Sequence, residues 1–295
     1  MQPSTLQIRS WLTPSRVAAW LLLLGLLGWS YGSTLAGLVS RWWNEQDYVY
    51  CFLVPPFSVL LLWLRREMIP EEFVGSLWGI AFLAAAGLMR LVGAYSQMPL
   101  LDAESLVLCV AGVVVLVGGW SAMLWAWPGV LFLVFMVPLP GFVATMLSEP
   151  LQAIGARTST YILQTLGIAA TARGNIISLP HADLGVQEAC SGLRMLMLFV
   201  AVGTGAALIV PRPAWERVVL ILSSAPIAVI ANVTRISVTG VLYETAGPEW
   251  GELVFHNLAG YFMMPLAGVL LWMEMGLMSM LFRPPTPDEA WDDWL

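Results

Sequence analysis

Long apolar stretches recur along almost the whole chain, and they limit its fold more than any other feature does. A helix needs about 20 apolar residues to cross a bilayer, and eight stretches approach that length. They are Val17–Val39, Tyr48–Leu64, Val74–Tyr95, Ser105–Trp120, Ala122–Val137, Gly192–Val210, Val218–Tyr243 and Leu258–Phe282. The pattern therefore predicts an all-α polytopic membrane protein.

The composition supports this fold class. Of 295 residues, 59% are hydrophobic and only 11% are charged, and the mean hydropathy is +0.78. Soluble domains carry about 25% charged residues. We expect a single integral membrane domain over residues 1–295, with a transmembrane core at 17–282 and a short acidic tail at 283–295. Residues 1–16 are interpreted as the start of an anchor rather than a cleaved signal.

The arginines indicate how the chain is oriented in the membrane. All 13 basic residues are arginine, and basic residues concentrate on the cytoplasmic side of membrane proteins. With the amino terminus inside, the cytoplasmic loops hold Arg9, Arg16, Arg65, Arg66, Arg212, Arg217 and Arg283, whereas the outer loops hold Arg41, Arg157 and Arg173. This distribution favours eight crossings with both termini inside.

Residues 141–168 interrupt the series of spans. Apolar residues recur there at helical spacing, but Glu149, Arg157 and several hydroxyl groups lie among them. We interpret the segment as an amphipathic helix in the outer interface. If it crossed the membrane instead, Cys190 would change sides.

A polar loop follows this segment. Asn175–Leu179 predicts a short strand and Asp183–Val186 a turn into a second one. We expect a small extracytoplasmic β-loop that leads directly to Cys190. His181 within this loop is interpreted as a solvated residue.

Cys190 stands at the membrane entry of the sixth span. Ser191 and Gly192 can begin a helix there, and the positive end of a helix dipole favours a thiolate. Arg194, four residues on, shares a helix face with the cysteine and favours the thiolate further. Glu188 and Ser191 flank the sulfur and are predicted, with Arg194, to support the site. For Arg194, a purely structural role in helix packing stays equally open.

Two further polar residues lie in the same outer leaflet. Arg235 is embedded in the seventh span, and Asn232 lies one turn earlier, where its amide can hold the guanidinium. His256 opens the eighth span from the outer side. A thiol, an imidazole and a guanidinium can therefore converge: the cysteine attacks an acyl group, the histidine shuttles the proton and the arginine stabilises the oxyanion.

Structural interpretations compete with this chemistry. Arg235 could hold a packing ion pair and His256 could be an interfacial polar cap. Cys51 and Cys109 are interpreted as small buried residues, and Arg90 as a structural residue near a span end, from which its side chain can extend outward. The spacing of the three cysteines suggests no disulfide and no metal site, and nothing suggests a cofactor. No basic stripe indicates a nucleic-acid partner.

Two other functions use the same residues differently. Arg90, Arg194 and Arg235 could line the anion path of a transporter, although no internal repeat or pair of broken helices is visible. The chain could also be a non-catalytic assembly factor, which would tolerate the loss of Cys190 and His256.

The motifs of the last three spans resemble the exosortase/archaeosortase family. Its members carry an A-C-S-G motif, an N-x-x-R motif and an H-x-x-x-G motif, which here match Ala189–Gly192, Asn232–Arg235 and His256–Gly260. The resemblance extends through "FLVP" and "GNIISLP", roughly from Trp42 to Phe282. It assigns the catalytic cysteine, arginine and histidine to Cys190, Arg235 and His256.

The resemblance implies a cysteine transpeptidase of the bacterial inner membrane, with its active site on the periplasmic side. Its partners would be exported single-span proteins with a carboxy-terminal, often Pro-Glu-Pro-like, sorting signal, and an acyl acceptor that the sequence does not identify. An enzyme that only hydrolyses its substrate would use the same residues. The chain departs from many members before "FLVP", where Tyr50 and Cys51 replace a His-Gly pair, so a role for that histidine is in doubt here.

Overall fold

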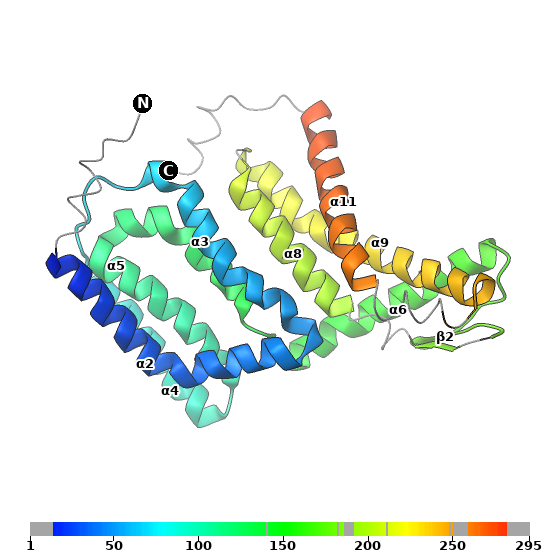
Figure 1. Cartoon of the computed structure of the whole chain (residues 1–295), viewed down its shortest axis with the longest axis horizontal. Helices are drawn as coiled ribbons and strands as arrows, with labels where there is room; N and C mark the ends of the chain where they lie inside the picture. Colours follow the sequence, from blue (N-terminus) through cyan, green and yellow to red (C-terminus); the bar gives the residue numbers. More distant parts are fainter. Residues whose placement is uncertain are drawn as a thin grey trace. The chain divides into compact units, whose positions relative to one another are not determined.

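The structure is a computed structural model that describes residues 14–139, 141–181, 183–185, 192–210, 212–247, 249 and 259–281. The described chain is mainly helical and divides into two compact units, Met1–Pro138 and Leu139–Leu295 (Figure 1). Four described helices are long and apolar enough to cross a bilayer: Leu21–Asn44, Trp78–Ser96, Pro99–Met136 and Ala214–Thr245. The polytopic helical class is therefore confirmed, whereas the count of eight crossings stays a prediction.

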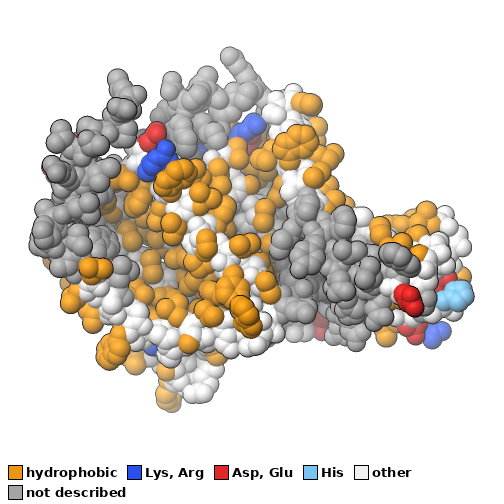
Figure 2. Space-filling view, in the orientation of Figure 1, with side chains coloured by type: hydrophobic (Ala, Val, Ile, Leu, Met, Phe, Trp, Pro, Cys, Tyr) orange, Lys and Arg blue, Asp and Glu red, His pale blue; other side chains and the backbone are white. Residues whose placement is uncertain are grey.

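Hydrophobic side chains cover most of the described surface on the face drawn in Figure 2, and charged side chains are few there. This distribution is the reverse of a soluble protein's, because lipid, unlike water, accepts an apolar exterior. Leu88 of the Trp78–Ser96 helix, for example, is 64% exposed.

Among the described residues, the first unit is built from four helices and short 3-10 segments. The helices are α2 (Pro14–Asn44), α3 (Val54–Leu64), α4 (Trp78–Ser96) and α5 (Pro99–Phe132). The 3-10 segments are η1 (Gln46–Leu53), η2 (Arg66–Met68) and η3 (Leu133–Met136). Helix α5 contacts α2, α3 and α4, so it forms the centre of this unit.

Helix α5 is broken at Gly119. This glycine has φ 71° and ψ −167°, a left-handed conformation that side chains other than hydrogen rarely adopt. The loop before α4 occupies the break: Ser76 N–H donates to the Val115 carbonyl at 3.1 Å, and the Val74 carbonyl lies where a Cβ of residue 119 would stand. The break falls at the junction of the predicted spans Ser105–Trp120 and Ala122–Val137. The first of these helices begins earlier than expected, at Pro99.

The described part of the second unit combines four helices with a small antiparallel sheet. The helices are α6 (Gly141–Thr165), α8 (Gly192–Ile209), α9 (Ala214–Thr245) and α11 (Ala259–Leu281). The strands β1 (Thr171–Arg173), β2 (Ile176–Ser178) and β3 (Asp183–Gly185) pair in the order β1-β2-β3. Helix α9 contacts α6, α8 and α11 and is therefore the central element.

The small sheet confirms the predicted β-loop with two differences, whereas its extracytoplasmic location stays a prediction. Strand β2 falls within the predicted strand Asn175–Leu179, but Asp183–Gly185 is itself a strand rather than a turn. Strand β1 was not expected, because three residues carry little periodicity. Its register pairs Thr171 with Ser178 and Arg173 with Ile176.

Helix α6 presents its small and polar side chains to the interior of the second unit. Gln152, Ser159 and Thr160 are buried, whereas Ile154 is 48% and Leu166, just past the helix end, 62% exposed. The predicted helix is confirmed, and apolar residues such as Ile154 and Leu166 face outward, as expected of an amphipathic helix that contacts lipid; its position in the outer interface stays a prediction. Such an exterior suits contact with acyl chains, and it leaves polar groups facing α9.

Candidate active site

Helix α9 carries the two predicted site residues whose side chains the structure describes. Arg235 is half-buried and Asn232, one turn earlier, is only 4% exposed. Arg194 lies in the first turn of α8, but its side chain is outside the described part of the chain. Cys190, Glu188, Ser191 and His256 also lie outside the described residues. The predicted convergence of thiol, imidazole and guanidinium therefore stays a prediction.

Asn232 is held where α9 crosses α6. A Cβ added to Gly155 of α6 would lie 3.4 Å from Asn232 Nδ2 and 3.3 Å from Ile236 Cδ1. The two helices approach this closely because residue 155 has no side chain. Within the described part of the chain, Asn232 Oδ1 is buried and accepts no hydrogen bond. A buried amide oxygen without a donor carries a free-energy cost of about 1–3 kcal/mol, and a catalytic role is one reason for such a group to be retained.

Other polar groups line the same α6–α9 contact. Ser159 of α6 donates to the Val233 carbonyl of α9 at 3.3 Å. The hydroxyl groups of Thr160, Ser237 and Thr239 are buried and, among described residues, have no hydrogen-bond partner. Arg235 therefore belongs to a helix that carries several buried polar groups rather than to a purely apolar span. Preorganised dipoles are what stabilise a developing negative charge.

The β-loop is docked firmly onto α6 and α9. Ile177 of β2 and Leu184 of β3 are buried in one cluster with Leu163 of α6 and Ile236 of α9. Asn175 Nδ2 donates to Gln152 Oε1 at 2.6 Å, which adds a polar contact to α6. The strand that leads toward Cys190 is thus fixed to the helix that carries Arg235.

The side chain of His181 is 72% exposed, as expected of a solvated loop residue, but it also has a partner that was not expected. Its ring and its backbone both contact Glu244, in the last turn of α9. Sequence reasoning missed this pair because the two residues are 63 positions apart. The acidic residues that follow Tyr243, which include Glu244, are the one sequence signal that could have indicated such a partner.

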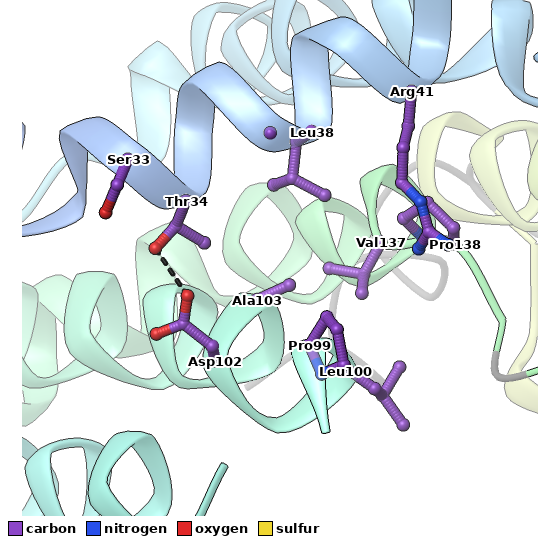
Figure 3. A pocket seen from close by; sticks show the side chains of 11 residues that line it. Ser33, Thr34, Leu38, Arg41, Pro99, Leu100, Asp102, Ala103, Val137 and Pro138 are labelled. Carbon is purple, nitrogen blue, oxygen red and sulfur yellow. Dashed lines mark hydrogen bonds between the residues drawn. The ribbon is translucent and has the colours of Figure 1, made fainter. Parts of the chain in front are cut away.

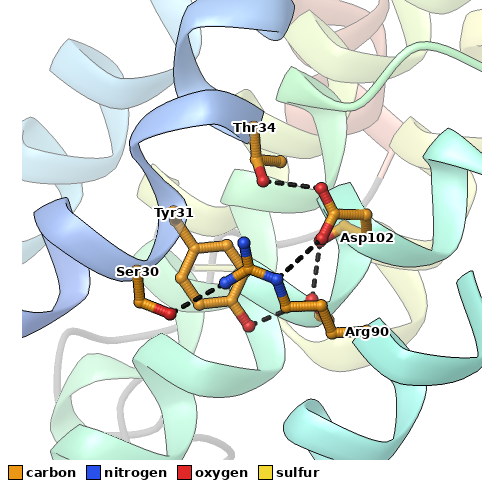
Figure 4. A network of polar contacts seen from close by, with 6 residues as sticks. Ser30, Tyr31, Thr34, Arg90 and Asp102 are labelled. Carbon is orange, nitrogen blue, oxygen red and sulfur yellow. Dashed lines mark hydrogen bonds and ion pairs between the residues drawn. The ribbon is translucent and has the colours of Figure 1, made fainter. Parts of the chain in front are cut away.

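The first unit contains a polar network of its own (Figure 4). Arg90 of α4 forms an ion pair with Asp102 of α5, and its guanidinium donates to Ser30 and lies over the ring of Tyr31, both in α2. Arg90 therefore contacts neighbouring helices rather than extending outward. A charge paired in this way is a poor element of an anion path, because its counter-ion is already in place.

A cavity of about 450 Å³ lies next to this network, between the end of α2 and the start of α5 (Figure 3). Asp102 and Thr34 line one side, joined by a hydrogen bond of 2.6 Å. Leu38, Arg41 and Val137 line the rest with neighbouring apolar residues. Arg41 pairs with Glu45 of its own helix at 3.3 Å. The cavity is amphipathic, and both charged groups at its wall are already paired.

The two described cysteines are free thiols with structural surroundings. Cys51 is fully buried, and its Sγ lies 3.5 Å from the Phe135 carbonyl. Cys109 is partly buried in α5. Across the described residues, no group of three or more His, Cys, Asp or Glu side chains is arranged to hold a metal ion.

Comparison with known protein families identifies the chain. The model of the transmembrane exosortase family, Exosortase_EpsH, matches residues 42–273. This range covers most of the chain and includes Cys190, Arg235 and His256, so the protein belongs to that family. No curated protein and no solved structure matches the chain.

Proposed function

We propose that the protein is a membrane cysteine transpeptidase that cleaves the carboxy-terminal sorting signal of exported proteins. Cys190 is the nucleophile, His256 the general acid–base and Arg235 the oxyanion-stabilising group. The observation that carries the proposal is the family match, which spans all three motifs in one chain. Asn232, Arg194, Glu188 and Ser191 are proposed to support these groups.

The reaction proceeds in two steps. His256 accepts the Cys190 proton as the sulfur attacks the scissile carbonyl, and the tetrahedral oxyanion is stabilised by Arg235. Collapse of this intermediate breaks the C–N bond, His256 protonates the leaving amine, and a thioester remains on Cys190. An acceptor nucleophile then loses its proton to His256, attacks the thioester and releases the product with regeneration of the thiol.

The location of Arg235 supports its assigned role. A charged residue inside a membrane span is expensive and is a functional candidate by default. Arg235 belongs to α9, a helix long and apolar enough to cross the bilayer, and it stands next to buried polar groups. An arginine also stays charged in a poorly hydrated site, which suits it to stabilise an oxyanion.

The proposed substrate is an exported protein with a single transmembrane helix near its carboxyl terminus. Such a helix can diffuse laterally against a polytopic enzyme in the bacterial inner membrane. Its scissile bond would lie at the periplasmic surface, where the sorting motif precedes the span. The acceptor distinguishes transfer from hydrolysis, since water would produce a free carboxylate.

Co-expression with a candidate substrate tests the proposal. We expect the wild type to shorten the substrate and Cys190→Ala to leave it intact, whereas the matched control Cys109→Ala keeps full activity. Loss of one oxyanion-stabilising group typically lowers the rate by about 100- to 1,000-fold, so Arg235→Ala should process very slowly. Mass spectrometry of the new carboxyl terminus separates hydrolysis from transfer. Normal processing by Cys190→Ala would refute the proposed mechanism.

A further inference from the structure

The cavity of the first unit lies where several of its helices end. Arg41 stands in the last turn of α2, and Pro99 begins α5. Val137, directly after η3, lines the same cavity. Trp43, two residues after Arg41, is 78% exposed, and tryptophan is enriched where the lipid head groups meet the apolar core of a bilayer. These positions place the cavity at the depth of the head groups rather than in the apolar centre of the membrane.

Arg41 brings hydrogen-bond donors to this cavity that the protein does not use. Its ion pair with Glu45 involves only Nε, and the two side chains are 50% and 46% exposed, so the pair is weak. Among the described residues, no acceptor contacts the two terminal nitrogens of Arg41. Its side chain extends from α2 toward Val137 and Pro138 (Figure 3). A guanidinium with free terminal N–H groups has the geometry to bind a phosphate.

Asp102 supplies the opposite charge on another side of the cavity. Its Oδ1 pairs with Arg90 and its Oδ2 accepts from Thr34. Each carboxylate oxygen can accept two hydrogen bonds, so both keep the capacity for a further donor. Thr34 and Arg41 are seven residues apart on α2, which corresponds to about 10 Å along the helix. The cavity therefore offers a cation at one end and an acceptor for a cationic group at the other.

The wall between these charges is apolar and leaves room for a ligand. Leu38 and Val137 line it, and the volume of about 450 Å³ lies in the range of small-molecule sites. Gly37 also lines the cavity, and a Cβ added there would meet no atom within 4 Å. An inorganic anion would occupy only the part beside Arg41, whereas a larger amphipathic molecule would contact the apolar wall as well.

We propose that this cavity binds a phospholipid whose head group carries a primary ammonium, as in phosphatidylethanolamine. Arg41 binds the phosphate, Asp102 accepts from the ammonium, and the glycerol portion contacts Leu38 and Val137. The bound lipid joins the end of α2 to the start of α5. This site lies within the first unit and takes no part in the chemistry proposed for Cys190, so either inference can fail without the other.

Lipid binding is measured on purified, delipidated full-length protein by native mass spectrometry. We expect one phosphatidylethanolamine to bind per chain. Phosphatidylcholine has the same phosphate, but its quaternary ammonium has no N–H to donate to Asp102, so its affinity should be about tenfold lower. Inorganic phosphate at the same concentration should neither bind nor displace the lipid.

Two matched pairs of variants locate the site. Arg41→Gln removes the guanidinium and should lower the affinity about tenfold, whereas Glu45→Gln breaks the same ion pair, keeps the guanidinium and should bind as wild type does. Gly37→Trp places a large side chain in the cavity and should abolish binding. Gly32→Trp is its control, because residue 32 also has open space on α2 but does not line the cavity. Thermal transitions in detergent check that each variant is folded.

Several results would overturn the proposal. Wild-type affinity in both Arg41→Gln and Gly37→Trp would show that the lipid binds elsewhere, and an equal loss in Gly32→Trp would show that it binds along α2 rather than in the cavity. Equal affinity for the two lipids would remove Asp102 from the site. Displacement of the lipid by inorganic phosphate would identify a site for free anions instead. Processing by Cys190→Ala would refute the catalytic proposal and leave this inference unchanged.

Discussion

Arg90 Nε lies 3.1 Å from Asp102 Oδ1, and the two side chains are 28% and 29% exposed. The pair joins α4 to α5 within the first unit. Thr34 donates to the other oxygen of Asp102, and Ser30 accepts from Arg90, so α2 is bound to the same pair. Three helices that share an apolar environment are thus held in register by one network of polar contacts.

Replacement of Arg90 by Ala should destabilise the first unit. The substitution leaves the Asp102 carboxylate with only Thr34 as a side-chain donor, and hydrogen bonds between charged groups contribute about 1–3 kcal/mol. We expect the free energy of unfolding in detergent to fall by that amount, and the thermal transition temperature to fall with it. Asp102→Asn should cost less, since the amide still accepts from Thr34. The exposed Glu72→Gln serves as control, and an equal transition temperature for Arg90→Ala and this control would contradict the prediction.

Gly119 and Gly87 should respond in opposite ways to substitution by Ala. Gly119 has a positive φ and no room for a Cβ beside the Val74 carbonyl, so Gly119→Ala should destabilise the protein by at least about 1–2 kcal/mol. Gly87 lies inside α4 with open space around it, so Gly87→Ala should be neutral or stabilise by about 0.5–1 kcal/mol. Thermal denaturation of both variants in the same detergent makes the comparison. Equal effects would show that the break in α5 is not required.

The helices could be predicted from the sequence because apolar length and periodicity are local properties. The break in α5 was also predictable, since two short apolar stretches met near the Gly118–Gly119 pair. The pairing of Arg90 was not, because Asp102 lies before the span that was expected to begin at Ser105. A contact between two helices depends on how they pack, and a pattern within one helix does not contain that information.

The candidate site shows the same division between local and non-local information. Asn232 and Arg235 were placed correctly on one helix by their spacing. The role of Gly155 was not visible, because only the crossing of α6 and α9 gives that glycine a neighbour. The outward-facing apolar residues of α6 agree with the amphipathic pattern of residues 141–168, whereas the contacts of the buried Gln152 and Ser159 depend on how α6 packs and could not be predicted.

Gly155→Ala should reduce activity without unfolding the protein. The new methyl group would lie 3.3 Å from Ile236 Cδ1, a tight contact that shifts this side chain slightly, and 3.4 Å from Asn232 Nδ2, so the crossing that holds Asn232 is disturbed. Misplacement of a positioning group far from the chemistry can lower a rate by about 100-fold. We expect Gly155→Ala to lower the processing rate by less than this, and Gly155→Leu to lower it more than Gly155→Ala does. For each variant, both the rate of substrate processing and the amount of protein in the membrane are measured. Gly268→Ala, in open space on α11, is the control, and full activity of Gly155→Leu would contradict the prediction.

Cys190 should be the one cysteine that a membrane-impermeant maleimide labels from the periplasmic side of intact cells. Cys51 is fully buried and Cys109 lies in the apolar helix α5, so a charged reagent reaches neither readily. Labelling should vanish in Cys190→Ser and persist in Cys51→Ser/Cys109→Ser. If Cys190 reacts only after the membrane is opened, the orientation of this part of the chain is reversed. That outcome would mean that residues 141–168 cross the bilayer, because one added crossing moves Cys190 and every later segment to the opposite side.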